Sequence, residues 1–263
     1  MTYFLTLRNG LLRNLLVLFS MLYSSLLWSQ DYDATLLWSQ KTALGTVVSG
    51  VVDKVYVNAG DKVKKGSKLT QLDISVFKGR VSEFRARLVS AREEFKEAER
   101  ERDRALELYD RTVLSEHDLQ VAKNNYVIAR AEYEKVQANL IEKEFDLKYS
   151  VVRAPFEAII LTRHAQPGQV IITRFKQKPL VIVAAADKML ARLLVTEDNL
   201  KKMTKDKTAT VTVAGRTFDG KIQTIALELA TDQSGLKGYY VDVEFKVDEA
   251  VLRSGQMAKV NIE

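Results

Sequence analysis

Two long segments in the middle of the chain carry apolar residues three and four positions apart. In the first segment the series comprises Val81, Phe84, Leu88, Ala91, Phe95, Ala98, Ala105 and Tyr109, with Arg102 at the one missing position. In the second segment it comprises Leu119, Ala122, Tyr126, Ala129, Tyr133, Val136, Leu140 and Leu147, with Lys143 out of pattern. This heptad spacing keeps one stripe of a helix against a partner helix. The pattern therefore predicts two long helices within residues 76–149.

The two apolar series match each other when they are read in opposite directions. Arg102 then faces Tyr126, Phe95 faces Tyr133, and the two residue numbers of each pair have a nearly constant sum. A constant sum means that the second helix folds back along the first, with the turn near residues 113–114. We therefore expect an antiparallel helical hairpin, in which small residues tend to face small ones.

The turn carries a helix-start signal. Ser115 is a favourable N-cap residue, and Asp118 follows three positions later, as in a capping box. Basic and acidic residues are nearly equal in number along the hairpin, which disfavours a nucleic-acid-binding arm. The pattern alone fits a solvated structural hairpin, and it equally fits a spacer that carries its tip to a distant partner.

Short apolar runs, cut by turn residues, lie on both sides of the hairpin. They predict strands near residues 46–49, 51–57, 69–72, 151–152, 159–161, 170–172 and 180–183. Because the two ends of a hairpin meet at one point, these runs are expected to form two halves of one small β domain with the hairpin inserted between them. A further β-rich stretch covers residues 188–263, with a short helix expected at 197–203.

The N-terminal 30 residues have the pattern of a targeting segment. Arg8 and Arg13 precede an apolar run at residues 15–28. This run has the length of a signal-peptide core and is short for a membrane span, so we expect either a cleaved signal peptide or an uncleaved N-terminal anchor. Both alternatives place the rest of the chain outside the cytoplasm.

Composition excludes several kinds of chemistry. The chain has no cysteine, which removes disulfides, thiol catalysis and cysteine metal sites. His117 and His164 are far apart and have no convergent ligands nearby in the sequence. No glycine-rich phosphate loop or nucleophile elbow occurs. We therefore expect no enzyme activity, no catalytic residues, no cofactor and no metal site, and no nucleic-acid partner.

The β segments resemble the two halves of a lipoyl-like domain. The first half reads Val48-Ser49-Gly50-Val51-Val52 and then Gly60-Asp61-Lys62-Val63-Lys64-Lys65-Gly66. The second half reads Val152-Arg153-Ala154-Pro155-Phe156 and then Pro167-Gly168-Gln169-Val170. Together they are similar to the periplasmic adaptor subunits, or membrane fusion proteins, of tripartite efflux pumps. Glu157 and Ala158 stand where members of that family usually have Asp and Gly.

The resemblance implies an α+β fold that is mainly β. A long antiparallel α-helical hairpin is inserted into a lipoyl-like β domain, and a small β-barrel follows. The implied domains are a signal peptide or N-terminal anchor at 1–30, the first lipoyl-like half with an N-terminal strand at 31–75, the hairpin at 76–149, the second lipoyl-like half at 150–186 and the barrel at 187–263. Larger relatives continue into a membrane-proximal domain, to which residues 31–41 of this chain could add one strand at most.

The resemblance also implies a docking site at the hairpin tip. In adaptors of this kind an Arg, a Leu four positions later and a Ser seven positions after that mark the end that meets the outer-membrane channel. Arg104, Leu108 and Ser115 have this spacing. Asn125 stands where the family has an acidic residue, so the fourth element of the pattern is missing.

The function implied is that of a non-catalytic periplasmic adaptor associated with the inner membrane. It would link an inner-membrane transporter, of the resistance-nodulation-division (RND) or ATP-driven (ABC) type, to an outer-membrane efflux channel. It would act as a homo-oligomer, a hexameric ring or a trimer of dimers. Two alternatives stay open: a secreted structural coiled-coil protein without a pump, and a lipoyl or biotinyl carrier subunit modified at Lys54. The sequence names no exported substrate.

Overall fold

The computed structural model describes residues 31–174, 178–232, 235–247 and 252–262. Its contacts divide the chain into two compact units. One unit is Gln40–Ala186, and the other joins the residues up to Ser39 with those from Asp187 onward. The predicted signal peptide or anchor at 1–30 lies outside the described residues.

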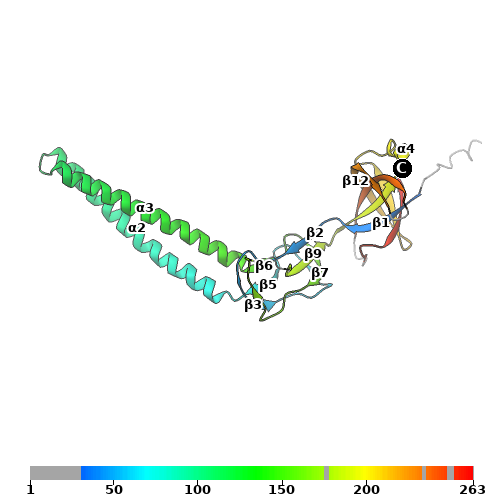
Figure 1. Cartoon of the computed structure of the whole chain (residues 1–263), viewed down its shortest axis with the longest axis horizontal. Coiled ribbons are helices and arrows are strands. Elements are labelled where there is room, and N and C mark those ends of the chain that lie inside the picture. Colours follow the sequence, from blue (N-terminus) through cyan, green and yellow to red (C-terminus); the bar gives the residue numbers. More distant parts are fainter. Residues whose placement is uncertain (1–30, 175–177, 233–234, 248–251, 263) are drawn as a thin grey trace, which may run out of the picture. The chain divides into compact units, whose positions relative to one another are not determined.

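Two long antiparallel helices form the hairpin of the first unit (Figure 1). Helix α2 is Ser75–Asp110 and helix α3 is Glu116–Tyr149, about 50 Å each at 1.5 Å per residue. The buried residues of the facing sides belong to the predicted apolar series, for example Val81 and Ala105 on α2 and Val136 on α3. The predicted hairpin is therefore confirmed.

The predicted facing pairs also meet. Phe95 stacks on Tyr133 with ring centroids 5.7 Å apart, and it contacts Tyr126 at 5.5 Å. The Arg102 guanidinium lies 4.0 Å from the centroid of the Tyr126 ring. Arg102 interrupts the apolar series without disrupting packing because its planar cation covers an aromatic face and its head reaches Asp103. The hydrogen bond that Arg102 donates to the Asp103 carboxylate raises the pKa of Arg102.

The hairpin emerges from a sandwich of two four-stranded sheets. The first sheet has the order β2 (Lys41–Leu44), β9 (Val181–Ala185), β7 (Ala158–Arg163) and β4 (Lys62–Val63). The second has the order β6 (Val151–Arg153), β5 (Lys68–Leu72), β3 (Gly50–Val55) and β8 (Val170–Ile171). A shared core between them includes Val52, Leu69 and Val183.

Both sheets combine strands from before and after the hairpin. Strand β5 directly precedes α2 in the chain, and it pairs with β6, which directly follows α3. At the base of the hairpin the Leu72 amide donates to the Ser150 carbonyl at 2.9 Å, and the Thr46 hydroxyl donates to the Tyr149 carbonyl at 2.9 Å. The hairpin is thus inserted into one β domain, and the predicted fold class is confirmed.

The second unit is a closed six-stranded antiparallel barrel. Its strands, in order around the barrel, are β1 (Asp31–Trp38), β10 (Lys188–Val195), β13 (Lys237–Lys246), β12 (Arg216–Thr231), β11 (Thr208–Val213) and β14 (Met257–Ile262). Inward-facing residues such as Leu36, Ile222 and Phe245 fill the interior. The short helix α4 (Glu197–Leu200) follows β10.

Strand β1 is placed differently from our expectation. We grouped residues 31–41 with the lipoyl-like half, or with a membrane-proximal layer, whereas β1 pairs with β10 on one side and β14 on the other. Ala34 and Leu36 are 2% and 0% exposed because alternate residues of β1 point into the barrel. Without β1 the edges of β10 and β14 would lack hydrogen-bond partners, so this strand closes the barrel.

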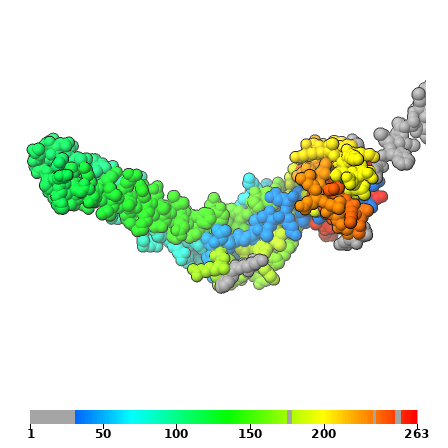
Figure 2. All heavy atoms as spheres, turned by 45° about the horizontal axis from the view of Figure 1, so that its top comes forward, coloured from blue at the N-terminus to red at the C-terminus, as the bar shows by residue number. Residues whose placement is uncertain are grey.

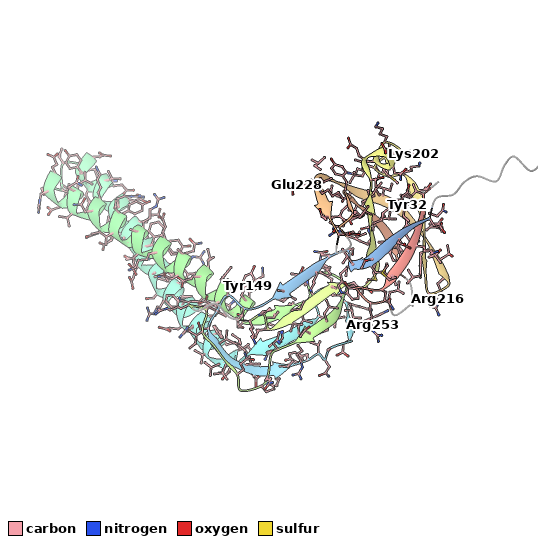
Figure 3. The ribbon with its side chains drawn as sticks, turned by 45° about the vertical axis from the view of Figure 1, so that its right-hand side comes forward. Tyr32, Tyr149, Lys202, Arg216, Glu228 and Arg253 are labelled. Atoms are coloured by element: carbon pink, nitrogen blue, oxygen red, sulfur yellow. The ribbon has the colours of Figure 1, made fainter. Side chains whose placement is uncertain are left out.

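The two ends of the barrel can be told apart by residues that Figure 3 labels. Lys202 and Glu228 lie at one end, and Arg216 and Arg253 lie at the other. Strand β12 is 16 residues long and has register shifts after Ile222 and Ile225. Such bulges let a long strand bend around a small barrel.

Candidate docking site at the hairpin tip

The turn at the tip ends helix α2 with a compact backbone motif. The Val113 amide donates to the Leu108 carbonyl at 2.9 Å, and the Thr112 amide donates to the Tyr109 carbonyl at 2.8 Å. This is the hydrogen-bond pattern of a Schellman motif, which requires a left-handed residue after the helix. Thr112 takes that conformation with φ of 60°, where glycine is usual. The tip therefore holds a β-branched residue in a strained backbone.

Helix α3 starts at the predicted cap. The Asp118 amide donates to the Ser115 hydroxyl oxygen at 3.2 Å, and that hydroxyl donates to the Asp118 carboxylate at 2.7 Å. Glu116 and Asp118 place negative charge at the positive end of the helix dipole. Ser115 is therefore the N-cap of α3, as predicted, and its hydroxyl is engaged by its two hydrogen bonds with Asp118.

The predicted tip residues lie on both sides of this turn. Arg104 is exposed and Leu108 is half-buried, one helical turn apart on α2, while Ser115 is exposed at the start of α3. Within the part of the chain that the structure describes, Arg104 has no hydrogen-bond or ion-pair partner, so its donors face solvent. Asn125 is exposed on α3.

Two exposed apolar residues at the tip were not among the predicted docking residues. Val113 is 72% exposed in the turn, and Tyr109 is 39% exposed on the last turn of α2. Val113 stands inside the predicted turn at 113–114, and an apolar residue in a turn is a signal that could have been read from the sequence. Together with Leu108 and Arg104, these side chains offer an apolar knob beside a cation, which is the composition of a protein-docking surface.

His117 is exposed, and the described residues contain no group of His, Asp or Glu side chains arranged to hold a metal ion. Lys54, the residue of the carrier alternative, lies on β3 opposite Gln71 and not at a turn. No helix among the described residues is long and apolar enough to cross a membrane.

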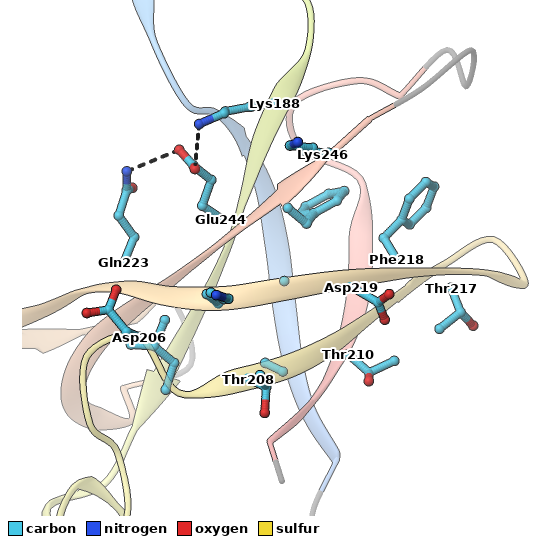
Figure 4. Close-up of a pocket in the computed structure, with 15 residues that line it drawn as sticks. Lys188, Asp206, Thr208, Thr210, Thr217, Phe218, Asp219, Gln223, Glu244 and Lys246 are labelled. Atoms are coloured by element: carbon cyan, nitrogen blue, oxygen red, sulfur yellow. Dashed lines mark hydrogen bonds and ion pairs between the residues drawn. The ribbon is translucent and has the colours of Figure 1, made fainter.

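A concavity of about 780 Å³ lies on the barrel wall (Figure 4). Two of its charged side chains pair with each other: Lys188 Nζ lies 2.9 Å from Glu244 Oε1, and Gln223 Nε2 donates to Glu244 Oε2 at 3.1 Å. The hydrogen bond to Glu244 raises the pKa of Lys188. These contacts tie strand β10 to strand β13 and the neighbouring β12 on the barrel wall.

These features define a class of protein: a helical hairpin inserted in a barrel-sandwich domain, followed by a six-stranded barrel. The family model described as "CzcB-like, barrel-sandwich hybrid domain" matches residues 41–176. The chain belongs to this family, and the predicted membership of the periplasmic adaptor, or membrane fusion protein, group is confirmed.

Individual relatives agree with this assignment. The macrolide export protein MacA of Yersinia pestis is 25% identical over 243 residues, covering 85% of this chain and 65% of the relative. The nodulation protein NolF of Rhizobium meliloti (strain 1021) is 24% identical over 221 residues, covering 82% of this chain and 58% of the relative. The chain thus spans about 58–65% of the length of these relatives.

Solved structures show the same fold. A chimera of MacA and MexA, which contains the Pseudomonas aeruginosa MexA α-hairpin domain, matches with a TM-score of 0.67 and 22% identity over 89% of this chain and 81% of the chimera. The membrane fusion protein Spr0693 from Streptococcus pneumoniae R6 matches with a TM-score of 0.66 and 15% identity over 89% of this chain and 99% of Spr0693.

Proposed function

We propose that this chain is a non-catalytic periplasmic adaptor that links an inner-membrane transporter to an outer-membrane channel in an efflux or secretion system. The observation that carries the proposal is the exposed tip of a two-helix rod in a chain of the membrane fusion protein family. The relatives named as macrolide export proteins support a role in export. The adaptor acts mechanically: it joins two membrane components and performs no reaction.

In this proposal the hairpin tip docks on the outer-membrane channel. Leu108 supplies an apolar contact, and Arg104 donates hydrogen bonds to carbonyls or carboxylates of the partner. Ser115 holds the start of α3 in place through its contact with Asp118, so it supports the docking surface by shaping the turn. The hairpin, proposed as the domain 76–149, sets the reach of the adaptor.

The other domains have proposed partners as well. The barrel, residues 187–263 closed by β1, faces the inner-membrane transporter of the RND or ABC type. The lipoyl-like halves and the hairpin pack laterally in a ring of several copies, a hexamer or a trimer of dimers. The chain works in the periplasm in association with the inner membrane.

Two tip substitutions test the docking role. Arg104→Asp reverses the charge of the free cation, and Leu108→Ser removes the apolar contact. We expect each to abolish export of the transported compound while secretion and the far-UV circular dichroism spectrum stay unchanged. Arg92→Asp, which changes an exposed arginine lower on α2, is the matched control and should export normally. Normal export by both tip variants would refute the docking role.

Cysteine crosslinking in cells identifies the partners directly. The chain has no native cysteine, so one introduced at Leu108 or at Leu194 is its only thiol. The tip cysteine should capture an outer-membrane channel, and the barrel cysteine an inner-membrane protein. A tip cysteine that captures only other copies of this chain would favour a structural coiled coil instead.

A further inference from the structure

Strands β12 and β13 continue beyond the barrel wall and form a two-stranded arm. Strand β11 pairs only with residues 216–221 of β12, whereas the pairing of β12 with β13 continues to Thr231. We call residues 226–232 and 235–239 the arm. Three leucines of the arm are exposed to solvent, Leu227 by 96%, Leu229 by 59% and Leu236 by 49%. The arm therefore concentrates aliphatic side chains that the barrel core does not use.

A bulge in β12 turns Leu227 toward solvent. Ile225 is opposite Val241 and Leu229 is opposite Tyr239, so three residues of β12 lie across from a single residue of β13. Bulges of this kind re-aim a side chain and recur at functional positions. The exposed surface of Leu227 stays in water in the isolated chain, which is unfavourable. The bulge thus presents an apolar side chain for which this chain has no use in its own core.

The arm lies at the end of the barrel where strand β1 begins. Tyr239 of the arm is opposite Val195, the last residue of β10, and Ala34 is opposite Leu193, two residues before that end. Asp31, the first residue of β1, is therefore close to the level of the arm. In Figure 2 the orange atoms of this part of the chain lie at the surface of the barrel, beside the yellow atoms of α4 and the segment after it.

The sequence places an apolar segment directly before this end of the barrel. The apolar run at residues 15–28 ends three positions before Asp31. Three residues of extended chain span at most about 10 Å. If the run is kept as a membrane anchor, which is one of the two expectations stated above, this end of the barrel lies within about 10 Å of the bilayer. The leucines of the arm are thus at the end of the barrel from which they can reach lipid.

The charges around the arm balance one another. The segment 197–207, which includes α4, carries four lysines and three acidic residues. The arm adds Lys237 on one side and Glu228 and Asp232 on the other. Balanced charge gives little attraction to an anionic surface. An interaction made by this end of the barrel therefore depends on its leucines and not on its lysines.

We propose that the arm inserts its leucines into the surface of a lipid bilayer, so that this end of the barrel is itself a membrane contact. Aliphatic side chains of such a contact are buried at the boundary between headgroups and acyl chains. The inference rests on the inner-membrane association in the proposed function. It adds a lipid contact that the barrel makes by itself, apart from any N-terminal anchor.

A bilayer fits this arm better than a protein partner does. Residues that dominate protein interfaces are mostly Trp, Tyr and Arg, and leucine is under-represented among them. The three most exposed apolar residues of the arm are all leucine. Fluid lipid accepts aliphatic side chains without a shaped pocket, and it tolerates a mixed-charge rim that stays in the headgroup layer.

The test places a spin label on the arm of the full-length chain and keeps all three leucines. The chain has no native cysteine, so Thr231→Cys gives one labelling site on the arm. Thr217→Cys is the matched control, because it changes an exposed threonine of the same strand next to Arg216, at the other end of the barrel. Both chains are reconstituted into phosphatidylcholine vesicles.

Electron paramagnetic resonance then compares collisions of the label with oxygen, which enters lipid, and with a water-soluble nickel chelate. The label at position 231 should become accessible to oxygen and protected from nickel, while the label at position 217 should stay accessible to nickel. Because charge contributes little, adding phosphatidylglycerol or salt should leave this difference unchanged.

Removing the leucines should reverse the result. Each leucine that leaves lipid should lower the inserted population by about tenfold or more. Leu227→Ser combined with Leu229→Ser should therefore return the label at position 231 to water, with an unchanged circular dichroism spectrum, because both side chains are exposed. Met257→Ser is the control: it removes a side chain that is 67% exposed at the start of β14, and insertion should persist.

Four outcomes would overturn the proposal. The label at position 231 could stay in water, it could enter lipid only when phosphatidylglycerol is present, or both labels could enter lipid to the same extent. The label could also be protected from nickel and oxygen together, which would indicate a protein contact between copies. The second outcome would assign binding to the lysines, and the third would indicate unspecific adsorption.

The result is separable from the test of the docking role. If the label at position 231 stays in water while Leu108→Ser abolishes export, the lipid contact is wrong and the adaptor function stands. If the label enters lipid while both tip variants export normally, the lipid contact stands and the docking function is wrong.

Discussion

Arg102 shows how a single side chain can break a pattern and keep the fold. In the sequence it stands where the heptad series requires an apolar residue, and in the structure it covers the Tyr126 ring at 4.0 Å. The guanidinium is flat and weakly hydrated, so it replaces an apolar contact between the helices while its edge remains in solvent. Thr112 breaks a different rule, because a left-handed backbone disfavours its β-branched side chain.

Asp73 links helix α2 to pH. Its carboxylate accepts hydrogen bonds from the Ser75 hydroxyl at 2.6 Å and the Ser75 amide at 2.9 Å, and these bonds lower the pKa of Asp73 from 3.8. A lowered pKa in the folded state stabilises the fold above the unfolded pKa, and this contribution is lost as the pH falls through the folded value.

We therefore expect acidification from about pH 6 to below about pH 3 to loosen the first turn of α2. Amide hydrogen exchange in that turn measures the effect. Asp73→Asn should make the turn faster-exchanging at pH 6 and remove this part of its pH dependence. Ser82→Ala, which changes an exposed serine later in α2, is the control. Equal pH dependence in Asp73→Asn and the native chain would contradict the assignment.

At the scale of elements, strand β13 depends on a close approach that only glycine permits. A Cβ atom at Gly238 would lie 2.6 Å from the Val195 carbonyl oxygen, at the end of β10. The obstacle is backbone in a paired strand, so it cannot move aside as a flexible side chain would. The packing of the start of β13 against the end of β10 thus requires a residue without a side chain.

Gly238→Ala should destabilise the barrel by about 1–3 kcal/mol, the usual cost of overpacking. Thermal or urea unfolding followed by near-UV circular dichroism measures the change. Gly215→Ala is unsuitable as a control because Gly215 has a φ of 79°, which disfavours any residue with a side chain. Ala214→Gly is the control that we choose. Ala214 lies next to Gly215 in the turn between β11 and β12 and has a φ of 48°, so glycine there should not destabilise the barrel. An unchanged unfolding midpoint for Gly238→Ala would show that β10 moves aside.

At the scale of the whole molecule, the chain folds as two units whose cores share no residues. The barrel core draws on both ends of the described chain, since Leu36 of β1 packs with Phe245 and Val260. The sandwich core lies entirely within the other unit. A defect in β1 should therefore affect one unit alone.

Leu36→Ala should lower the stability of the barrel by about 2–5 kcal/mol, because the removed side chain is fully buried. The stability of the sandwich and hairpin should stay as it is. Hydrogen exchange monitored by mass spectrometry separates the two units within the full chain. Leu69→Ala in the sandwich should give the converse result, and a loss of protection in both units for either variant would contradict independent folding.

The helical hairpin and its turn could be predicted from the sequence because helix periodicity, antiparallel register and capping depend on residues close in sequence or related by one fold-back. The facing pairs Phe95–Tyr133 and Arg102–Tyr126 follow from that register alone. The tip residues Arg104, Leu108 and Ser115 could be placed at the correct end of the hairpin for the same reason, while their docking role stays a prediction.

Only the tertiary structure decided which strands share a sheet and which apolar residues stay exposed. Strand β1 meets β10 and β14 across more than half of the chain, and nothing in its own alternating pattern distinguishes the barrel from the sandwich. The same holds for the bidentate pair of Arg192 and Asp242, whose atoms lie 2.7 and 2.8 Å apart. Local patterns determined the elements of this protein, whereas tertiary pairing determined the partners of its strands. The backbone N–H and C=O groups of a strand form their hydrogen bonds with another strand, and for β1 both partner strands lie far away in sequence.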